Sequence, residues 1–280
     1  MTTAVEPREQ TIQARGLRFH YVEWGESGAP VIVLLHGLSS TCRIWDSFAR
    51  AFQDRRRLLA LDQRGHADSS WPAGPDYATD DYVADLEALV DSWRLERFAI
   101  VGLSMGGMNG IAYAARHPDR VTHLVPVDIR PAFDREKLPS RAMDKHIAES
   151  GHPTVEDHEA ALRLVRLTNQ TTPDEPLRHR LRHLLKPLPE GGWTFKHDPR
   201  VSFCWRPSNL WDELPKVQAP ALIVRGGKSQ VLPEDVAENM RAAFPRADLV
   251  TIEEAGHTVP EDAPARFIEA LEGFLGRYPG

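Results

Sequence analysis

Short apolar runs separated by segments of helical periodicity occupy most of the chain. We expect strands at residues 31–35, 57–61, 98–102, 121–127, 221–225 and 248–252, and an edge strand of mixed alternation at residues 17–24. Continuous apolar runs of this length are typical of strands that are buried on both faces of a parallel sheet. The pattern therefore predicts an α/β fold, in which a mostly parallel central sheet carries helices on both faces.

Two of the helical segments have a clear apolar face. The first follows Thr79-Asp80-Asp81, where the threonine is expected to cap the helix and the acids to match the positive end of its dipole. Its apolar positions are Val83, Leu86, Val90 and Trp93. The second lies near the end of the chain and places at helical spacing Phe267, Ile268, Leu271, Phe274 and Leu275. Each pattern predicts an amphipathic helix that packs on the sheet.

The strand rhythm stops between about residues 131 and 215. Helical stretches rich in Arg, His, Leu and Pro replace it, together with the turn Pro189-Glu-Gly-Gly192. We interpret residues 131–215 as a helical cap inserted into a core that comprises residues 1–130 and 216–280. An insertion between two strands of such a sheet emerges at their carboxyl edge, where α/β proteins bind ligands.

Composition and charge exclude several classes of partner. The 280 residues are 41% hydrophobic and 26% charged, which is typical of a globular enzyme, and the formal net charge is −6. A net negative charge argues against nucleic acid or an anionic membrane surface as partner. Cys42 and Cys204 lie far apart and neither belongs to a C-x-x-C motif, so we expect neither a disulfide nor a zinc site.

The start of the chain and its longest apolar run bear on location. Residues 1–7 lack a basic region followed by an apolar one, so they do not resemble a signal peptide. The longest uninterrupted apolar run, residues 31–35, is far too short to span a bilayer. These observations predict a cytoplasmic protein that does not associate with a membrane.

A serine lies where a strand is expected to turn directly into a helix. The run is Gly102-Leu103-Ser104-Met105-Gly106-Gly107, and His117-Pro118 ends the helix that follows. Glycines two positions before and after the serine are needed there, because side chains would collide as the backbone turns tightly. The serine hydroxyl would stand at the carboxyl edge of the sheet above a helix N-terminus, which favours developing negative charge. Ser104 is therefore a candidate nucleophile.

Three further motifs follow predicted strands in the same order as in a known family. They are Leu35-His36-Gly37-Leu38 after the second apolar strand, Asp62-Gln-Arg-Gly-His-Ala-Asp-Ser69 after the third, and Glu254-Ala-Gly-His-Thr-Val-Pro260 after the last. With the serine motif, they resemble the α/β-hydrolase superfamily, and in particular its capped esterase, lactonase and epoxide-hydrolase-like branch. The resemblance covers essentially the whole chain outside the predicted cap.

The resemblance assigns roles to individual residues. His257 would act as the general base, because serine is a poor nucleophile until a neutral imidazole removes its proton. The backbone amides of Leu38 and Met105 would form the oxyanion hole. His36, beside the oxyanion loop, is expected to be structural.

The acidic partner of the histidine departs from the commonest family pattern. Many relatives carry aspartate in a G-x-x-S-D loop after the strand that follows the cap, whereas here Ser229 is followed by Gln230. The end of the strand before the cap offers Asp128 instead, a position that some family members use. We assign Asp128, and Asp235, Glu234 and Glu254 stay as alternatives. Gln230 would then orient His257 or line the pocket.

Large side chains near these motifs are candidates to line an apolar acyl or alcohol site. The candidates are His36, Trp45, Met105, Met108, Phe133, Trp205, Trp211 and Gln230. Any of the apolar ones can equally belong to the core, so residue type and position alone leave the pocket open.

A serine at the turn selects among the family's chemistries. Related epoxide hydrolases and haloalkane dehalogenases place aspartate there, so the resemblance implies a hydrolase that cleaves a small-molecule carboxylic ester or lactone through an acyl-enzyme, without cofactor or metal. Carbon–carbon bond hydrolases, perhydrolases and a ligand receptor with slow or no turnover remain as alternatives. The sequence does not specify the substrate or the oligomeric state.

Overall fold

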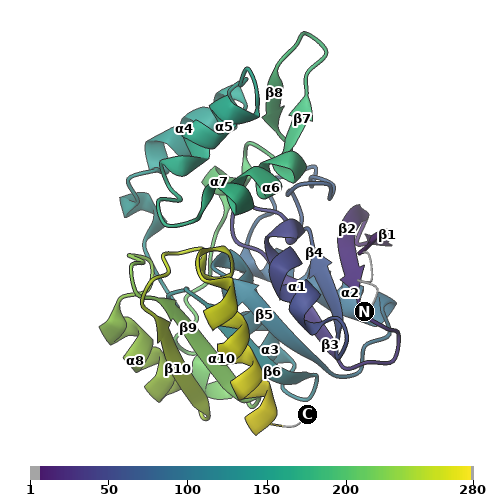
Figure 1. Cartoon of the computed structure of the whole chain (residues 1–280), viewed down its shortest axis with the longest axis vertical. Coiled ribbons are helices and arrows are strands. Elements are labelled where there is room, and N and C mark those ends of the chain that lie inside the picture. Colours follow the sequence, from purple (N-terminus) through teal and green to yellow (C-terminus); the bar gives the residue numbers. More distant parts are fainter. Residues whose placement is uncertain (1–6, 279–280) are drawn as a thin grey trace.

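A computed structural model describes residues 7–278, and residues 1–6 and 279–280 lie outside the described part. The prediction drawn from the first residues of the chain therefore falls largely outside it. Eight strands form one sheet in the order β1-β2-β4-β3-β5-β6-β9-β10 (Figure 1). Their bounds are β1 Arg8–Ala14, β2 Leu17–Trp24, β3 Val31–Leu35, β4 Arg57–Leu61, β5 Phe98–Leu103, β6 Val121–Val127, β9 Ala221–Gly226 and β10 Ala247–Ile252. From β4 to β10 all pairings are parallel.

The edge of the sheet differs from the prediction. Residues 17–24 form a strand, but β1 lies outside it and pairs with it antiparallel. The sequence of β1, REQTIQA, is polar and mostly exposed, as expected of an edge strand whose faces contact little core. A strand of this kind carries almost no apolar signal, and the sequence analysis missed it for that reason.

Helices cover both faces of the sheet, which confirms the predicted α/β fold. One face carries α2 (Thr79–Ser92), α3 (Met105–Arg116) and α8 (Glu234–Ala243), and the other carries α1 (Asp46–Phe52) and α10 (Pro264–Arg277). In Figure 1, α1 and α10 lie in front of the sheet. Successive residues of β3 point to opposite faces, so that Val33 packs with α2 and α3 while Leu34 packs with α1 and α10.

The predicted cap of α2 is wrong in detail. Ala78 occupies the cap position, and its amide donates to the side chain of Asp81 at 2.9 Å. The hydroxyl of Thr79 instead accepts a hydrogen bond from the amide of Ser208 at 2.9 Å. The segment around Arg206 runs alongside the start of α2. The backbone amides of this segment need hydrogen-bond acceptors, and the Thr79 hydroxyl serves as one of them.

Residues 131–215, called the insertion below, leave the sheet after β6 and return before β9 (Figure 1). Their elements are η2 Arg135–Lys137, α4 Arg141–Ser150, α5 His158–Arg166, α6 Asp174–Leu184, β7 Leu185–Pro187, β8 Trp193–Phe195, α7 Val201–Cys204 and the start of η3 Leu214–Lys216. A small apolar cluster of its own joins Val155, Ala161, Leu162, Leu177, Leu181 and Leu185. The last part of the insertion contributes to the main core the side chains of Val201, Trp205, Leu210 and Leu214. This part therefore anchors the remainder of the insertion to the core.

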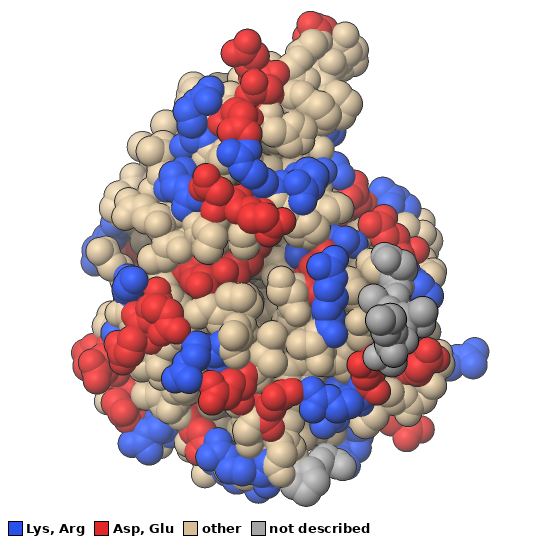
Figure 2. Space-filling model, in the orientation of Figure 1, with Lys and Arg blue, Asp and Glu red and all other residues tan. Residues whose placement is uncertain are grey.

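Three smaller elements complete the described fold. They are η1 Cys42–Trp45, which precedes α1, the short helix α9 Val259–Asp262, which precedes α10, and the remainder of η3. On the face that Figure 2 shows, acidic and basic side chains are interspersed, and neither sign forms a continuous field. Within residues 7–278, no helix is both long enough and apolar enough to cross a bilayer.

A buried acid lies where the insertion meets α9. Glu261 is 7% exposed, and its carboxylate faces Arg180 of α6 at 3.5 Å. Burial raises the pKa of Glu261 to about 7; Arg180 and His179 oppose this shift, and Asp262 and Asp46 reinforce it. Because the pKa in the folded state exceeds the ordinary value of 4.5, the folded protein prefers the protonated acid. The stability contributed by this group is present below pH 4.5 and is lost as the pH rises through about 7.

We therefore expect Glu261→Gln to raise the free energy of unfolding at pH 8 by about 1–3 kcal/mol and to leave it nearly unchanged below pH 4.5. Urea denaturation of both proteins across this pH range measures the difference. Glu269→Gln on the exposed face of α10 is the matched control and should show no such pH dependence. A Glu261→Gln variant that is less stable than the parent at pH 8 would mean that its ion pair with Arg180 outweighs the cost of burial.

Candidate active site

Ser104 lies at the junction of β5 and α3 in a backbone conformation that few residues adopt. Its φ is +52° and its ψ is −121°, and it occupies the cap position of α3. Such a conformation costs about 1–3 kcal/mol and persists only where surrounding contacts impose it. The Ser104 amide donates to the carbonyl of Val127 at 2.9 Å, which fixes the serine beside the end of β6. The side chain is half-buried at the carboxyl edge of the sheet.

The two glycines around Ser104 allow the close approach that the sequence analysis expected. A Cβ on Gly102 would lie 2.4 Å from the carbonyl oxygen of Gly106, and one on Gly106 would lie 2.2 Å from the carbonyl oxygen of Leu35. Both distances are far shorter than a van der Waals contact. The first turn of α3 therefore packs directly on the ends of β3 and β5, and this packing forces the tight turn at the serine.

His257 and Asp128 form a hydrogen-bonded pair beside this turn. Nδ1 of His257 lies 2.7 Å from Oδ2 of Asp128. Asp128 follows β6, is fully buried and has a φ of +47°. His257 follows β10 and is half-buried. Ser104, Asp128 and His257 follow β5, β6 and β10, so the three residues come from the carboxyl ends of parallel strands at one edge of the sheet.

Of the four carboxylates that the sequence left open, Asp128 is the one bonded to His257. Glu234 and Asp235 begin α8, and Glu254 follows β10; all three are exposed. In the described part of the chain, no hydrogen bond joins any of them to the histidine. The same holds for Ser104 Oγ and His257, a contact that often becomes short only when a substrate is bound.

The loop after β9 contributes a residue that the sequence analysis missed. Ser229 Oγ donates to Oδ2 of Asp128 at 2.5 Å, and the amide of Gly226 donates to Oδ1 at 3.1 Å. Gln230 is exposed, and its backbone carbonyl accepts a hydrogen bond from Arg130; within the described residues its side chain makes no hydrogen bond with His257. A signal was present, because the serine of the family's G-x-x-S-D pattern is retained at position 229.

The predicted oxyanion loop lies directly against the serine. A Cβ on Gly37 would lie 3.2 Å from Cβ of Ser104, which shows how closely the loop approaches. Met105 begins α3, and its amide therefore has no partner within the helix. Within residues 7–278, no hydrogen bond occupies the amide of either Leu38 or Met105. Both N–H groups are thus available to a ligand at this edge.

Hydrogen bonds among buried polar groups fix the position of the oxyanion loop. Nε2 of His36 accepts a hydrogen bond from the amide of Gln63 at 3.0 Å, and the Gln63 side chain donates to the His36 carbonyl at 2.7 Å. Asn109 of α3 donates in turn to Gln63 at 2.9 Å. Burial lowers the pKa of His36, so its ring is neutral and can accept the bond. His36 therefore supports the loop, as the sequence analysis expected, and is fully enclosed.

The candidate pocket residues do not form one group. Trp45 is completely buried and packs against Phe48 and Phe267 between the sheet and the helices α1 and α10. Met105 and Met108 are buried in the core on the opposite face. The expectation that Trp45 and Met108 line a pocket is therefore corrected, because helix packing on the sheet encloses them.

The aromatic residues of the insertion are placed differently. Phe133 and Trp205 have ring centroids 5.6 Å apart, and the guanidinium of Arg135 lies 5.0 Å above the Trp205 ring. Trp211 is half-buried against the main core. Phe133 and Trp205 are thus the candidates that share an aromatic cluster at the base of the insertion.

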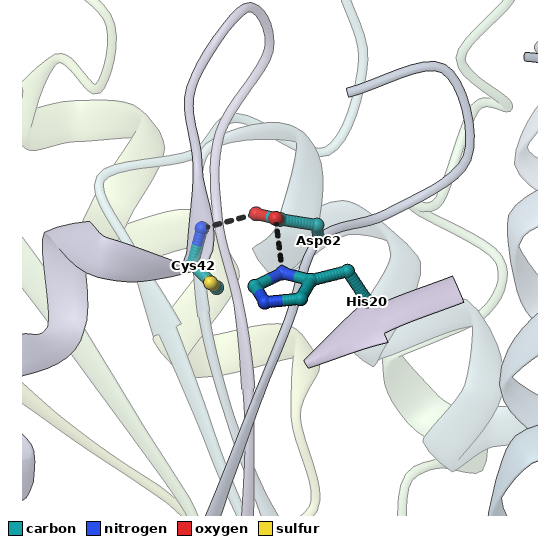
Figure 3. Close-up of side chains that lie close together, drawn as sticks. All are labelled: His20, Cys42 and Asp62. Atoms are coloured by element: carbon teal, nitrogen blue, oxygen red, sulfur yellow. Dashed lines mark hydrogen bonds and ion pairs between the residues drawn. The ribbon is translucent and has the colours of Figure 1, made fainter. Parts of the chain in front are cut away.

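His20, Cys42 and Asp62 bring three potential metal-binding atoms within 4.8 Å of one another (Figure 3). The contacts of Asp62 indicate a hydrogen-bonded cluster and not a metal site. Its Oδ2 pairs with Nδ1 of His20 at 2.7 Å, and its Oδ1 accepts from the Cys42 amide at 2.6 Å and from Thr41 Oγ1 at 3.1 Å. Although burial opposes the charge of Asp62, the hydrogen bond and charge of His20 and the hydrogen bond from the Cys42 amide lower its pKa to about 2.

The Cys42 thiol does not favour an ion either. Burial and the neighbouring Asp62 raise the pKa of Cys42 well above its ordinary value, whereas a metal binds the thiolate. We conclude that this cluster is a structural ion pair that fixes the segment after the oxyanion loop to the end of β4.

Residues 30–264 match the family model described as alpha/beta hydrolase fold. Esterase Rv0045c of Mycobacterium tuberculosis is 29% identical over 272 residues, covering 96% of this chain and 89% of the relative. The sn-1-specific diacylglycerol lipase ABHD11 of Mus musculus is 30% identical over 258 residues, covering 90% of this chain and 82% of the relative.

A similar architecture is found in the crystal structure of E-2-(acetamidomethylene)succinate hydrolase. Its TM-score is 0.86 at 23% identity, and the match covers 97% of this chain and all of that one. At this identity the likeness shows the fold alone. Together with the family match over most of the sequence, it leads to one conclusion: the chain belongs to the α/β-hydrolase family, within its esterase branch.

Proposed function

We propose that this protein is a hydrolase that cleaves a small-molecule carboxylic ester or lactone through an acyl-enzyme, with Ser104, His257 and Asp128 as its catalytic residues. The observation that carries the proposal is the 2.7 Å hydrogen bond between His257 Nδ1 and Asp128, formed beside the strained serine turn. Within residues 7–278, the backbone amides of Leu38 and Met105 beside this turn have no hydrogen-bond partner. The names of the mycobacterial esterase and the mouse lipase support an ester bond as the target.

The hydrogen bond to Asp128 determines which nitrogen of His257 acts as the base. With its proton on Nδ1, the neutral ring has a free electron pair on Nε2. Nε2 removes the proton from Ser104 Oγ as that oxygen attacks the substrate's carbonyl carbon. The carbonyl oxygen gains negative charge, which the amides of Leu38 and Met105 stabilise. Asp128, buried and charged, stabilises the imidazolium that forms.

The second half of the reaction regenerates the enzyme. The tetrahedral intermediate collapses and releases the alcohol, which takes the proton from His257. His257 then deprotonates a water molecule that attacks the acyl carbon, and the carboxylic acid leaves as Ser104 recovers its proton. In a lactone the alcohol and the acyl group belong to one molecule, so the product is a single hydroxy acid.

The position of the insertion supports a role as a cap. It leaves the sheet three residues after Asp128, and in Figure 1 it stands at one end of the sheet. Phe133, which is half-buried against Trp205 at its base, is the remaining aromatic candidate for contact with a partly apolar substrate. The division into core residues 1–130 and 216–280 and cap residues 131–215 belongs to this proposal.

Ser104→Ala should lower the rate of hydrolysis of a chromogenic ester roughly 10⁴-fold or more, because the covalent route requires the hydroxyl. A fluorophosphonate should label the parent at Ser104 and leave the variant unlabelled, as mass spectrometry of the intact protein can show. Ser92→Ala at the exposed end of α2 is the control and should be labelled like the parent. Substantial turnover by folded Ser104→Ala would overturn the serine mechanism, and a labelled parent without sustained turnover would indicate a receptor.

Asp128→Asn should lower kcat by about 10²–10⁴-fold, since an amide can neither orient His257 in the same way nor balance its positive charge. Asp235→Asn, an exposed change on α8, should leave kcat within about twofold. Steady-state kinetics on one ester compare the two variants directly. If Asp235→Asn is the damaging change, the acid acts from the start of α8 and the assignment fails.

Dialysis against EDTA should leave kcat/KM unchanged, because the proposed steps use an imidazole and backbone amides in place of a metal ion. Ester hydrolysis measured before and after dialysis checks this expectation. Loss of turnover on dialysis that a divalent metal restores would contradict the mechanism.

A further inference from the structure

A short segment of the insertion contacts the residues on both sides of His257. Asn169 and Thr172 bound this segment, which lies between α5 and α6. On one side of the histidine, Thr258 Oγ1 donates to Oδ1 of Asn169 at 3.4 Å. The same oxygen accepts a hydrogen bond from Arg180 of α6 at 2.9 Å, so Asn169 is itself held in place.

On the other side, Asp262 joins the insertion to the residue before the histidine. Its Oδ2 accepts hydrogen bonds from the amide of Gly256 at 2.7 Å and from Thr171 Oγ1 at 2.6 Å. Its Oδ1 accepts a bond from Thr172 Oγ1 at 2.5 Å. Asp262 lies on α9 and therefore belongs to the core, so this carboxylate fastens the insertion and the histidine loop to each other.

The contact at Gly256 is too close for any water to intervene. A Cβ on Gly256 would lie 2.2 Å from Thr171 Oγ1, and Thr172 is 1% exposed. The hydroxyl of Thr171 thus rests on the backbone of the residue next to His257. The insertion and the loop that carries His257 are therefore packed directly against each other at this point.

The insertion also reaches the oxyanion loop. Ser202 of α7 and Ser39 share a hydrogen bond of 2.9 Å between their hydroxyls. Ser39 has a φ of +57° and directly follows Leu38, whose amide is one of the two proposed oxyanion donors. The insertion therefore touches the two loops that carry the base and the oxyanion donor, and it does so through side-chain hydroxyls.

We propose that the segment Asn169–Thr172 is a positioning element for His257, so that the seating of the insertion on Asp262 determines whether the imidazole is aligned for catalysis. This inference rests on the proposed function, because it assigns a role in aligning the base. A misplacement of about 1 Å in a catalytic group can cost about 10²-fold in rate. The insertion would then do more than cover the substrate, since its departure would disable the base.

The test uses the rate constant for labelling of Ser104 by a fluorophosphonate, which needs no knowledge of the substrate. The variant Thr171→Val/Thr172→Val removes both hydroxyls with little change in shape and leaves Ser104, His257 and Asp128 intact. We expect its labelling rate to fall roughly 10-fold or more, and Thr171→Ser/Thr172→Ser to restore it to within about threefold of the parent.

A matched control breaks a contact between insertion and core that lies away from the histidine loop. Lys196 Nζ is 2.8 Å from both carboxylate oxygens of Asp68, and Lys196→Met removes this ion pair. Its labelling rate should stay within about twofold of the parent. The proton on Nδ1 of His257 gives a second readout, because its downfield NMR signal should shift or broaden in the valine variant and stay unchanged in the methionine variant.

The outcomes separate the two proposals. An unlabelled parent would refute the proposed function, whereas a labelled parent with an equally fast and folded valine variant would overturn the positioning role alone. Equal losses in the valine and methionine variants would also overturn it, since any loosening of the insertion would then suffice. If the double variant does not fold, Thr171→Val alone is measured, and a rate within twofold of the parent would refute the role.

Discussion

A fully buried carboxylate at the end of β6 organises the candidate site. Asp128 is removed from solvent, and a charge in that position is tolerated only where donors surround it. Its donors come from the Gly226 amide at the end of β9, from Ser229 in the following loop and from His257 after β10. The need to satisfy one carboxylate therefore brings three separate parts of the chain to one point, next to the serine turn.

The loop after β9 is held in place by hydrogen bonds from the segment that follows β6. Arg130, two residues after Asp128, donates to the carbonyls of Val231 at 2.5 Å and of Gln230 at 2.9 Å. Many relatives carry the acid in this loop, whereas here the loop donates to an acid on the neighbouring strand. Asp128 and the loop after β9 can meet because β6 and β9 are adjacent parallel strands whose carboxyl ends lie side by side.

Periodicity and motif order were sufficient to predict the sheet, its parallel strands and the helices on both faces, because burial imposes a pattern on each of those segments. The polar strand β1 lacks such a pattern and was missed. Ser104 stood out because glycines on both sides are needed for its turn. The hydrogen bond from Ser229 to Asp128 spans 101 positions, and the contacts of Gln63 with His36 and Asn109 span 27 and 46. Contacts of this kind depend on how loops meet in space, which no local pattern encodes.

Side chains of the insertion and of the core alternate around the loop that carries His257. The insertion therefore supports this loop as well as standing beside the site. Asp262 belongs to the core but gains two of its donors, Thr171 and Thr172, from the insertion. Without those hydroxyls, the Asp262 carboxylate would keep one donor, the Gly256 amide, and would need water molecules for its other hydrogen bonds. Water entering there would lie one residue from His257, so excluding it protects both the position of the loop and the low dielectric in which the charge of Asp128 acts.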